Sequence, residues 1–332
     1  MKKILNDPAA YADETIDGMC RAHPDIYRKV ADNLRVITRA KKGRDGKVGV
    51  VTGGGSGHLP VFAGYVGEGL LDACAVGDVF ASPSAEEMAI AIRAADAGAG
   101  VVRLYGNYGG DVMNFDMAGD LVELDDIRTT TVLLADDVAS APFAEREKRR
   151  GVAGMVPTFK IAGAAADTGA DLDTVTRIAQ KAADACRSIG VALTPCVVPA
   201  AGRPTFTLGE DEMEIGMGIH GEPGVQRGKL GPANAIADAM MDRLFDDAKL
   251  SHGERVFLLV NSLGATPVEE LYIMFNRIAD RLRDKSATIA RSLVGRYATS
   301  MEMTGASVTL MALDAELEKL LSAPARCAFW QV

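Results

Sequence analysis

The pattern of apolar and polar residues predicts short buried strands alternating with helices in the first half of the chain. Runs rich in β-branched residues, which are typical of buried strands, occur at Val48–Thr52, Val101–Tyr105 and Thr129–Leu134. Between the first two runs, the capping-box pattern Ser84–Glu87 predicts the start of a helix. Strands and helices that alternate in this way are typical of a parallel sheet covered by helices on both faces.

A second series of strands and helices begins near residue 186. Strands are predicted at 188–193, 255–260, 289–295 and 307–311. Thr266 precedes a proline and lies three residues before Glu269, which predicts that Thr266 caps a helix. A chain of 332 residues exceeds the size that one hydrophobic core usually reaches. We therefore predict two α/β lobes, residues 1–185 and 186–332, each with a mostly parallel or mixed sheet covered by helices.

The segment Met213–Ile219 carries an apolar residue at every second position, which predicts a strand with one buried face. The turn Gly221–Gly224 would stop that strand, so His220 is expected at its end. The glycine spacing of Gly216–Gly221 matches a dinucleotide fingerprint, but a proline-containing turn follows where a helix must begin, which argues against a dinucleotide site. His220 is thus an imidazole flanked by glycines. Either a small ligand can approach it closely, or it is a histidine with satisfied hydrogen bonds in a tight turn.

Composition and charge narrow the class of protein. The chain is 48% hydrophobic and 24% charged, as in soluble globular proteins, and its acidic residues outnumber its basic ones by 45 to 36. The net charge of −9 argues against nucleic acid and acidic membranes as partners. The sequence shows neither an export signal nor an apolar run long enough to span a bilayer, so a cytoplasmic protein is expected.

Cysteine and carboxylate spacing give no indication of a metal site. The five cysteines are widely spaced and never form a CxxC pair, which predicts reduced thiols. Because an HExxH sequence is also missing, no metal is expected. The pair Asp136–Asp137 follows a predicted strand and is interpreted as a solvated turn rather than as a metal ligand or a base.

Three glycine-rich loops follow predicted strands, and each carries a reactive side chain: His58, Asp111 or His220. Ligands of open α/β sheets bind at the carboxyl ends of the strands, so these three loops are candidates to converge on one site. The first loop, Gly53–His58, lacks the consecutive Lys-Ser or Lys-Thr of a P-loop. We therefore expect no ATP site in this loop.

Taken together, six segments resemble the substrate-binding K subunit of dihydroxyacetone kinases, the DhaK family. They occur in the family's order and cover nearly the whole chain: Gly53–His58, Gly77–Pro83, Asn107–Asp111, Pro199–Pro204, Glu214–Gly224 and Asn261–Pro267. Each segment alone is a weak signal, whereas the set is highly specific.

The resemblance implies a role for each reactive side chain. His220 would add to the ketone of the substrate and hold it as a covalent hemiaminal, while His58 and Asp111 would contact and deprotonate the substrate hydroxyl. Neutral imidazole is available at pH 7 and can attack the ketone carbon of a ketose. A polyol such as glycerol has no electrophilic carbon, so covalent capture would select ketoses over polyols. The other implied substrate contacts are Gly55, Ser56, Gly57 and Ser82.

The resemblance also implies partners. In similar kinases the phosphoryl group comes from a nucleotide-binding L subunit or fused module, which holds ATP or ADP and Mg, and the K subunit is a homodimer. The sequence ends at Val332 without such a module, so this chain is expected to bind a ketose but not to phosphorylate it with ATP alone. Both ATP and a phosphotransferase relay remain open as the ultimate donor.

Two residues depart from the pattern of bacterial K subunits. Leu59 stands where glutamate is common, and Gly106 stands where lysine is common. Both changes remove charge near the expected site, which motivates the hypothesis of a larger substrate such as the four-carbon ketose erythrulose. A non-catalytic paralogue that senses a ketose and activates a regulator is the alternative, although the presence of all three reactive side chains favours an enzyme.

Overall fold

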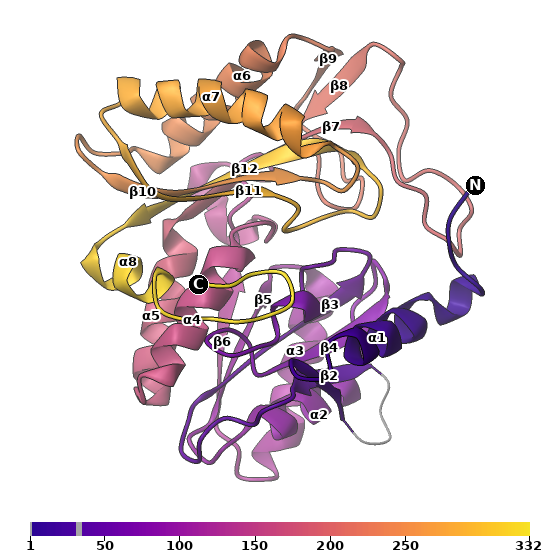
Figure 1. Ribbon diagram of the computed structural model, residues 1–332, viewed down its shortest axis with the longest axis vertical. Helices are drawn as coiled ribbons and strands as arrows, with labels where there is room; N and C mark the ends of the chain where they lie inside the picture. Colours follow the sequence, from indigo (N-terminus) through magenta and orange to yellow (C-terminus); the bar gives the residue numbers. More distant parts are fainter. Residues whose placement is uncertain (1, 31–34) are drawn as a thin grey trace. The chain divides into compact units, whose positions relative to one another are not determined.

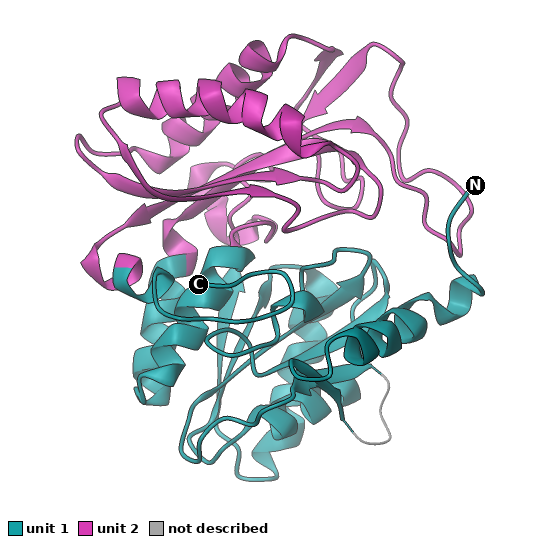
Figure 2. Ribbon diagram, in the orientation of Figure 1, with its two compact units in different colours: residues 1–134, 155–182, 319–332 teal, residues 135–154, 183–318 magenta. Residues whose placement is uncertain are grey.

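The computed structural model describes residues 2–30 and 35–332 and divides into two compact units (Figure 1). Figure 2 shows unit 1, formed by residues 1–134, 155–182 and 319–332, and unit 2, formed by residues 135–154 and 183–318. Each unit contains one six-stranded sheet accompanied by helices. The prediction of two α/β lobes is therefore confirmed.

The sheet of unit 1 has four parallel strands extended by two antiparallel ones. Its strand order is β1-β2-β4-β3-β5-β6, and β3 pairs in parallel with both β4 and β5. The bounds are β1 (Tyr27–Lys29), β2 (Val36–Arg39), β3 (Gly49–Ser56), β4 (Ala73–Val79), β5 (Val101–Gly106) and β6 (Thr129–Leu134). The predicted parallel sheet of the first lobe is confirmed in these four strands, although β4 was not predicted.

Helices cover both faces of this sheet. The helices of unit 1 are α1 (Tyr11–Ala22), α2 (Ala85–Ala95), α3 (Gly109–Glu123), α4 (Met155–Asp167) and α5 (Leu172–Ala185), with short 3-10 turns at Pro8–Ala10 and Ala63–Tyr65. The predicted capping box at Ser84 and Glu87 opens α2. A Cβ atom on Gly53 would meet Phe115 of α3, whereas one on Gly54 would meet Phe62, because successive strand residues face opposite sides.

The sheet of unit 2 is mostly antiparallel. Its order is β11-β10-β12-β7-β8-β9, and within the described residues β10 and β11 form its one parallel pair. The strands are β7 (Cys186–Thr194), β8 (Glu212–Ile215), β9 (Gln226–Lys229), β10 (Arg255–Ser262), β11 (Thr288–Gly295) and β12 (Thr304–Leu313). This arrangement confirms the mixed alternative that the sequence left open for the second lobe.

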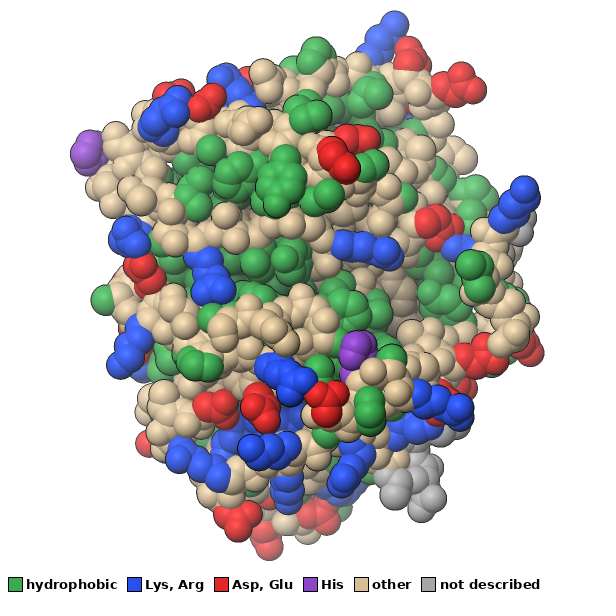
Figure 3. Space-filling model, in the orientation of Figure 1, with side chains coloured by type: hydrophobic (Ala, Val, Ile, Leu, Met, Phe, Trp, Pro, Cys, Tyr) green, Lys and Arg blue, Asp and Glu red, His purple; other side chains and the backbone are tan. Residues whose placement is uncertain are grey.

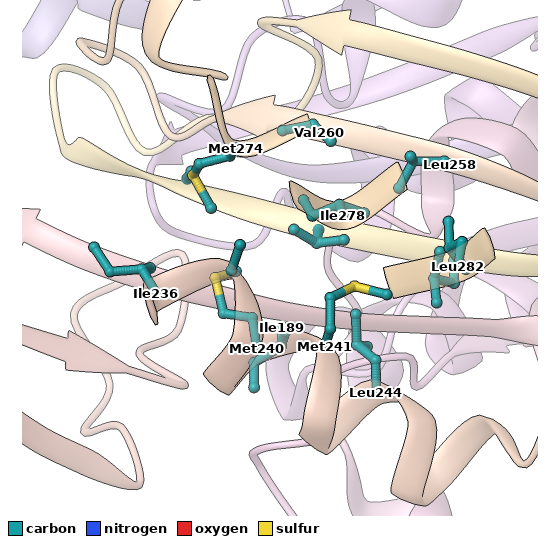
Figure 4. Packing of buried hydrophobic residues seen from close by; sticks show 14 of the residues in the cluster. Ile189, Ile236, Met240, Met241, Leu244, Leu258, Val260, Met274, Ile278 and Leu282 are labelled. Atoms are coloured by element: carbon teal, nitrogen blue, oxygen red, sulfur yellow. The ribbon is translucent and has the colours of Figure 1, made fainter. Parts of the chain in front are cut away.

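Two long helices pack on the sheet of unit 2 through an apolar layer. Figure 4 shows Met240, Met241 and Leu244 of α6 (Ala233–Ala248) together with Ile278 and Leu282 of α7 (Val268–Asp284). The shorter elements of this half are the 3-10 helix η3 (Phe143–Lys148) and the helix α8 (Ala315–Leu321). None of the helices in the described part of the chain is both long and apolar enough to cross a bilayer.

The two units are not contiguous in sequence, which differs from the predicted single boundary at residue 186. Residues 135–154 belong to unit 2 because Asp136 and Arg149 bond to its strand β7 and helix α6: Ser188 N donates to Asp136 O at 2.7 Å, and Arg149 Nη1 donates to Asp247 at 3.0 Å. Residues 319–332 return to unit 1, where Lys160 Nζ donates to the carbonyl of Leu320 at 2.8 Å. Hydrophobic periodicity predicts elements but carries no information about such long-range pairing.

The predicted strand Met213–Ile219 is wrong in its second half. Strand β8 ends at Ile215 because Gly216 has a φ of +86°, which lies outside the extended region. Met217 and Ile219 are nevertheless buried, so the apolar alternation reflects burial within a turn. His220 consequently lies in this turn rather than at a strand end.

The predicted helix cap at Thr266 is also wrong. Helix α7 begins at Val268 after Pro267, and no side chain caps it. The hydroxyl of Thr266 instead donates to the carbonyl of Gly305 at 2.7 Å and accepts from its backbone N–H at 2.8 Å. The hydroxyl of Thr266 thus bonds to Gly305 of strand β12 instead of to the first turn of helix α7.

Gly163 tests how closely helix α4 packs on the segment before β4. A Cβ atom here would lie 2.5 Å from Leu70 Cα and 2.6 Å from Leu70 C, closer than real Cβ contacts. We expect Gly163→Ala to lower the free energy of unfolding by about 1–3 kcal/mol, because the helix must shift away from a backbone that cannot yield. Urea unfolding followed by circular dichroism measures this change.

Gly18→Ala in helix α1 is the matched control. Nothing lies within 4 Å of a Cβ atom at Gly18, so the substitution should raise the free energy of unfolding by about 0.5–1 kcal/mol through helix preference alone. Equal responses of the two variants would contradict the close packing of α4.

Candidate active site

Three loops leave the same edge of the unit 1 sheet. Strand β3 lies between β4 and β5 and is parallel to both, so the segments that follow these strands emerge side by side. They contain Gly57–His58 after β3, Phe80–Ser82 after β4 and Asn107–Asp111 after β5. This edge is where open α/β sheets bind their ligands.

His58 is held in an aromatic setting at this edge. Its side chain is almost fully buried and stacks on Phe80 with a centroid distance of 4.7 Å, while Phe62 contacts it edge-on at 6.2 Å. The loop after β4 crosses close to β3: Phe80 N donates to Ser56 O at 3.0 Å, and a Cβ atom on Gly55 would lie 2.7 Å from Ala81 N. Glycine at position 55 therefore permits the contact between Phe80 and His58.

Asp111 lies in the first turn of helix α3, although the sequence placed it in an exit loop. Its side chain is 7% exposed, and the positive end of the helix dipole stabilises its ionised form. Asn114, one turn further, donates to Ser82 Oγ at 3.4 Å and to Pro83 O at 2.8 Å. These bonds tie the loop that carries Ser82 to the helix that carries Asp111.

Ser56 presents a polar atom to this edge. Its Oγ is buried and has no hydrogen-bond partner among the described residues. The two glycines beside it are half-buried, and Gly57 has a φ of +96°, a conformation that glycine adopts without strain. A hydroxyl left unpaired between glycines is well suited to bonding a small polar ligand.

In unit 2, the side chain of His220 is oriented by Glu222. His220 Nδ1 lies 2.8 Å from Glu222 Oε1, and the other carboxylate oxygen accepts from the backbone N–H of His220. Although burial opposes it, hydrogen bonding to His220 and the charges of His220 and Arg150 lower the pKa of Glu222 to about 2. The carboxylate is therefore ionised at neutral pH and can only accept, so Nδ1 carries the proton.

Arg150 links Glu222 to a buried aspartate. Its Nη1 lies 3.8 Å from Glu222, and its Nε donates to Asp137 at 2.9 Å. A third nitrogen of the guanidinium, Nη2, donates to the carbonyl of Gly216 at 3.1 Å. A Cβ atom on Gly218 would overlap the ends of the Glu222 and Arg150 side chains, so glycine leaves the space that they occupy.

The interpretation of Asp136–Asp137 as a solvated turn is wrong. Both side chains are buried, and Asp136 accepts from the backbone N–H groups of Val152 at 2.8 Å and Gly154 at 2.7 Å. Burial raises the pKa of Asp136, and burial raises that of Asp137 to about 6 even though Arg150 opposes the shift. These carboxylates accept hydrogen bonds from backbone and side-chain groups of the protein rather than from solvent.

Sequence reasoning missed Glu222, Arg150 and Asp137 as part of this site. Glu222 alone had a local signal, since a carboxylate two residues after a histidine in a tight turn can reach its ring. Arg150 and Asp137 lie far away in sequence and gave no such signal. Among the described residues, no group of three or more His, Cys, Asp or Glu side chains is placed to hold a metal ion.

The Dak1 domain model matches residues 17–329 of this chain. The chain belongs to the Dak1 family. It is 45% identical over 95% of its length to the dihydroxyacetone-binding subunit DhaK of the PTS-dependent dihydroxyacetone kinase 1 of Listeria innocua, and it covers 95% of that protein. It is also 42% identical to the L-erythrulose 1-kinase of Mycolicibacterium smegmatis over 98% of its length, but covers only 57% of that protein.

Two solved structures share this fold. The dihydroxyacetone kinase operon co-activator Dha-DhaQ superposes with a TM-score of 0.90 and 29% identity, covering 96% of this chain and 98% of the co-activator. The native dihydroxyacetone kinase of C. freundii superposes with a TM-score of 0.89 and 30% identity, covering 99% of this chain and 60% of the kinase. The Dak1 match spans every candidate site residue in both units.

The orientation of His220 by Glu222 can be tested directly. Glu222→Ala removes the acceptor of the Nδ1 proton, so we expect neutral His220 to change from the Nδ1–H form to one dominated by Nε2–H, which free histidine prefers. Nitrogen-15 chemical shifts of histidine-labelled protein distinguish the two forms.

Glu212→Ala is the control, because Glu212 lies on β8 but pairs with Arg227. The shifts of His220 should stay unchanged in this variant. If wild type and Glu222→Ala showed the same tautomer, the assigned hydrogen bond would be wrong.

Proposed function

We propose that this chain is the ketose-binding, catalytic subunit of a small-ketose kinase, and that a separate nucleotide-binding subunit supplies the phosphoryl group. The observation that carries the proposal is the His220–Glu222 hydrogen bond, which in the neutral form of this partly exposed imidazole places the proton on Nδ1 and the lone pair on Nε2. Membership of the Dak1 family supports the same assignment. The cytoplasmic location and the homodimer stay predictions.

Covalent capture follows from this tautomer. The lone pair of Nε2 attacks the ketone carbon, a C–N bond forms, and the carbonyl π electrons move to the oxygen. The oxygen gains a proton while Nδ1 loses one, with the ionised Glu222 stabilising the positive charge that develops on the ring between these steps. The product is a neutral hemiaminal whose mass is the sum of protein and ketose.

The edge of unit 1 supplies the groups for phosphoryl transfer. Asp111 and His58 are proposed to contact and deprotonate the hydroxyl that attacks the phosphoryl group. Ser56 and Ser82 are proposed to bond the other hydroxyls, since Ser56 Oγ is buried and unpaired within the described part of the chain. ATP or ADP and Mg would be bound by the partner subunit, where the metal neutralises charge on the transferred phosphate.

A ketose sensor that activates a regulator is the second candidate. The co-activator Dha-DhaQ superposes as well as the kinase does, so the fold is compatible with either role. The relatives with higher identity, at 42–45%, carry kinase names, which favours the enzyme. Sensing would require capture by His220 but no base at Asp111.

The substrate is proposed to be dihydroxyacetone or a four-carbon ketose. Relatives named for dihydroxyacetone and for erythrulose match this chain at 45% and 42–43% identity, a difference too small to decide. Gly106 ends β5 at the candidate edge and Leu59 follows His58, so neither position places a charged side chain there. The space left by Gly106 and the absence of charge at both positions favour the four-carbon ketose over dihydroxyacetone.

Native mass spectrometry tests capture and chain length together. After incubation with dihydroxyacetone or with either erythrulose enantiomer, we expect an adduct of the whole ketose without loss of water. His220→Ala should abolish it, because no other group is proposed to attack the ketone. The exposed His252 provides the control, and His252→Ala should leave the adduct unchanged.

A clear preference for the triose over both erythrulose enantiomers would reject the larger substrate. The absence of any adduct in wild type would reject covalent capture itself.

Asp111→Asn separates the enzyme from the sensor. We expect turnover with a cognate nucleotide-binding subunit to fall by about 10²–10⁴-fold, because amide nitrogen and oxygen cannot take the hydroxyl proton. The His220 adduct should persist in this variant. Steady-state kinetics and mass spectrometry measure the two quantities.

Asp120→Asn is the matched control, since Asp120 is exposed on the same helix. Its turnover should equal that of wild type. Full turnover of Asp111→Asn would remove Asp111 from the base role.

A further inference from the structure

Unit 1 contains a cavity of about 400 Å³ whose lining is rich in cations. Its basic side chains come from β1, β2 and the linker before β3: Arg28, Lys29, Arg39, Lys42 and Lys47. The one acidic residue among the described lining residues is Asp72, which directly precedes β4. The volume falls within the range of small-molecule sites.

Two buried cations share one carboxylate at this cavity. Lys47 Nζ lies 2.6 Å from Asp72 Oδ2, and Arg39 Nε lies 3.0 Å from Asp72 Oδ1. The side chains of all three residues are less than a tenth exposed. Asp167 is the second carboxylate near Lys47, at 3.7 Å, and is partly exposed. The carboxyl of Asp72 also accepts from Val50 N, so it is fully engaged.

Two of the three remaining cations have no matching carboxylate within the described chain. Lys29 pairs with Asp17, but Arg28 and Lys42 are exposed and form no ion pair with another described residue. Five cations thus face three carboxylates, although the whole chain carries a net charge of −9. Figure 3 shows many Lys and Arg side chains on the visible face of unit 1, with Asp and Glu side chains between them.

The cavity lies away from the candidate active site of unit 1. Lys47 and Asp72 precede the parallel strands β3 and β4, whereas His58 and Asp111 follow β3 and β5. The cavity therefore opens at the opposite edge of the same sheet. A ligand bound there would not occupy the place assigned to the ketose hydroxyl.

We propose that this cavity binds a small phosphate-bearing anion. A phosphate monoester carries about 1.5–2 negative charges at neutral pH, which matches a surplus of two cations. The guanidinium of Arg39 offers further donors beyond Nε, and lysine ammonium groups bind phosphate as point charges. The described lining contains no aromatic side chain on which a nucleobase could stack, so a phosphorylated sugar fits better than a nucleotide.

Isothermal titration calorimetry at low salt tests the site, with dihydroxyacetone phosphate and inorganic phosphate as separate titrants. The protein is the full chain carrying His220→Ala, so that binding is read whether or not the proposed kinase function holds. We expect a single site whose affinity falls at least about tenfold in Lys42→Glu, because a cation is replaced by an anion at the rim. Arg28→Glu should behave in the same way.

Lys41→Glu is the matched control. Lys41 is the neighbouring residue, is exposed and does not line the cavity, so the same change in net charge should leave the affinity within about twofold. Tighter binding of dihydroxyacetone phosphate than of inorganic phosphate would assign a sugar phosphate, and equal binding would assign the phosphate group alone.

Two outcomes would overturn the proposal. If neither titrant bound, the cations would serve only to neutralise Asp17, Asp72 and Asp167. Equal weakening by Lys41→Glu and Lys42→Glu would show a general effect of net charge instead of a site.

Discussion

Both candidate histidines depend on backbone that approaches neighbouring groups more closely than a Cβ atom would allow. In unit 1, Gly55 lets the loop of Phe80 cross the end of β3, and this loop supplies the ring that stacks on His58. In unit 2, Gly218 leaves the space filled by Glu222 and Arg150, which fix the orientation of His220. Glycines that leave room for close approach therefore position the two candidate histidines as much as the side chains in contact with them do.

Local sequence signals predicted the parts of this fold that local interactions determine. The capping box at Ser84 and the strand Thr129–Leu134 were predicted correctly, because hydrogen bonding to near neighbours and β-branched packing decide them. The predictions of a helix cap at Thr266 and of a strand over Met213–Ile219 were wrong, because interactions outside the local pattern decide the structure there. The hydroxyl of Thr266 donates to the carbonyl of Gly305, which is distant in sequence, and so does not cap the helix. The strand ends at Gly216 because this residue has a positive φ, although the apolar alternation of the sequence continues beyond it.

The candidate site was predictable to the same degree. The glycine-rich loops identified His58, Asp111 and His220, and resemblance to a family assigned them roles that periodicity alone could not. The groups that orient His220 were not predicted, since Arg150 reaches Glu222 from a segment about seventy residues earlier. Asp137 was misread as solvated because sequence does not show which turns become buried.

The division of the chain between its units also limits the order in which a growing polypeptide can fold. Unit 2 ends at Glu318, whereas unit 1 needs residues 319–332, including the carbonyl of Leu320 that Lys160 binds. Synthesis proceeds from the N-terminus, so every residue of unit 2 leaves the ribosome before unit 1 is complete. The unit that begins the sequence is therefore the one whose last contacts form only after all of unit 2 has been synthesised.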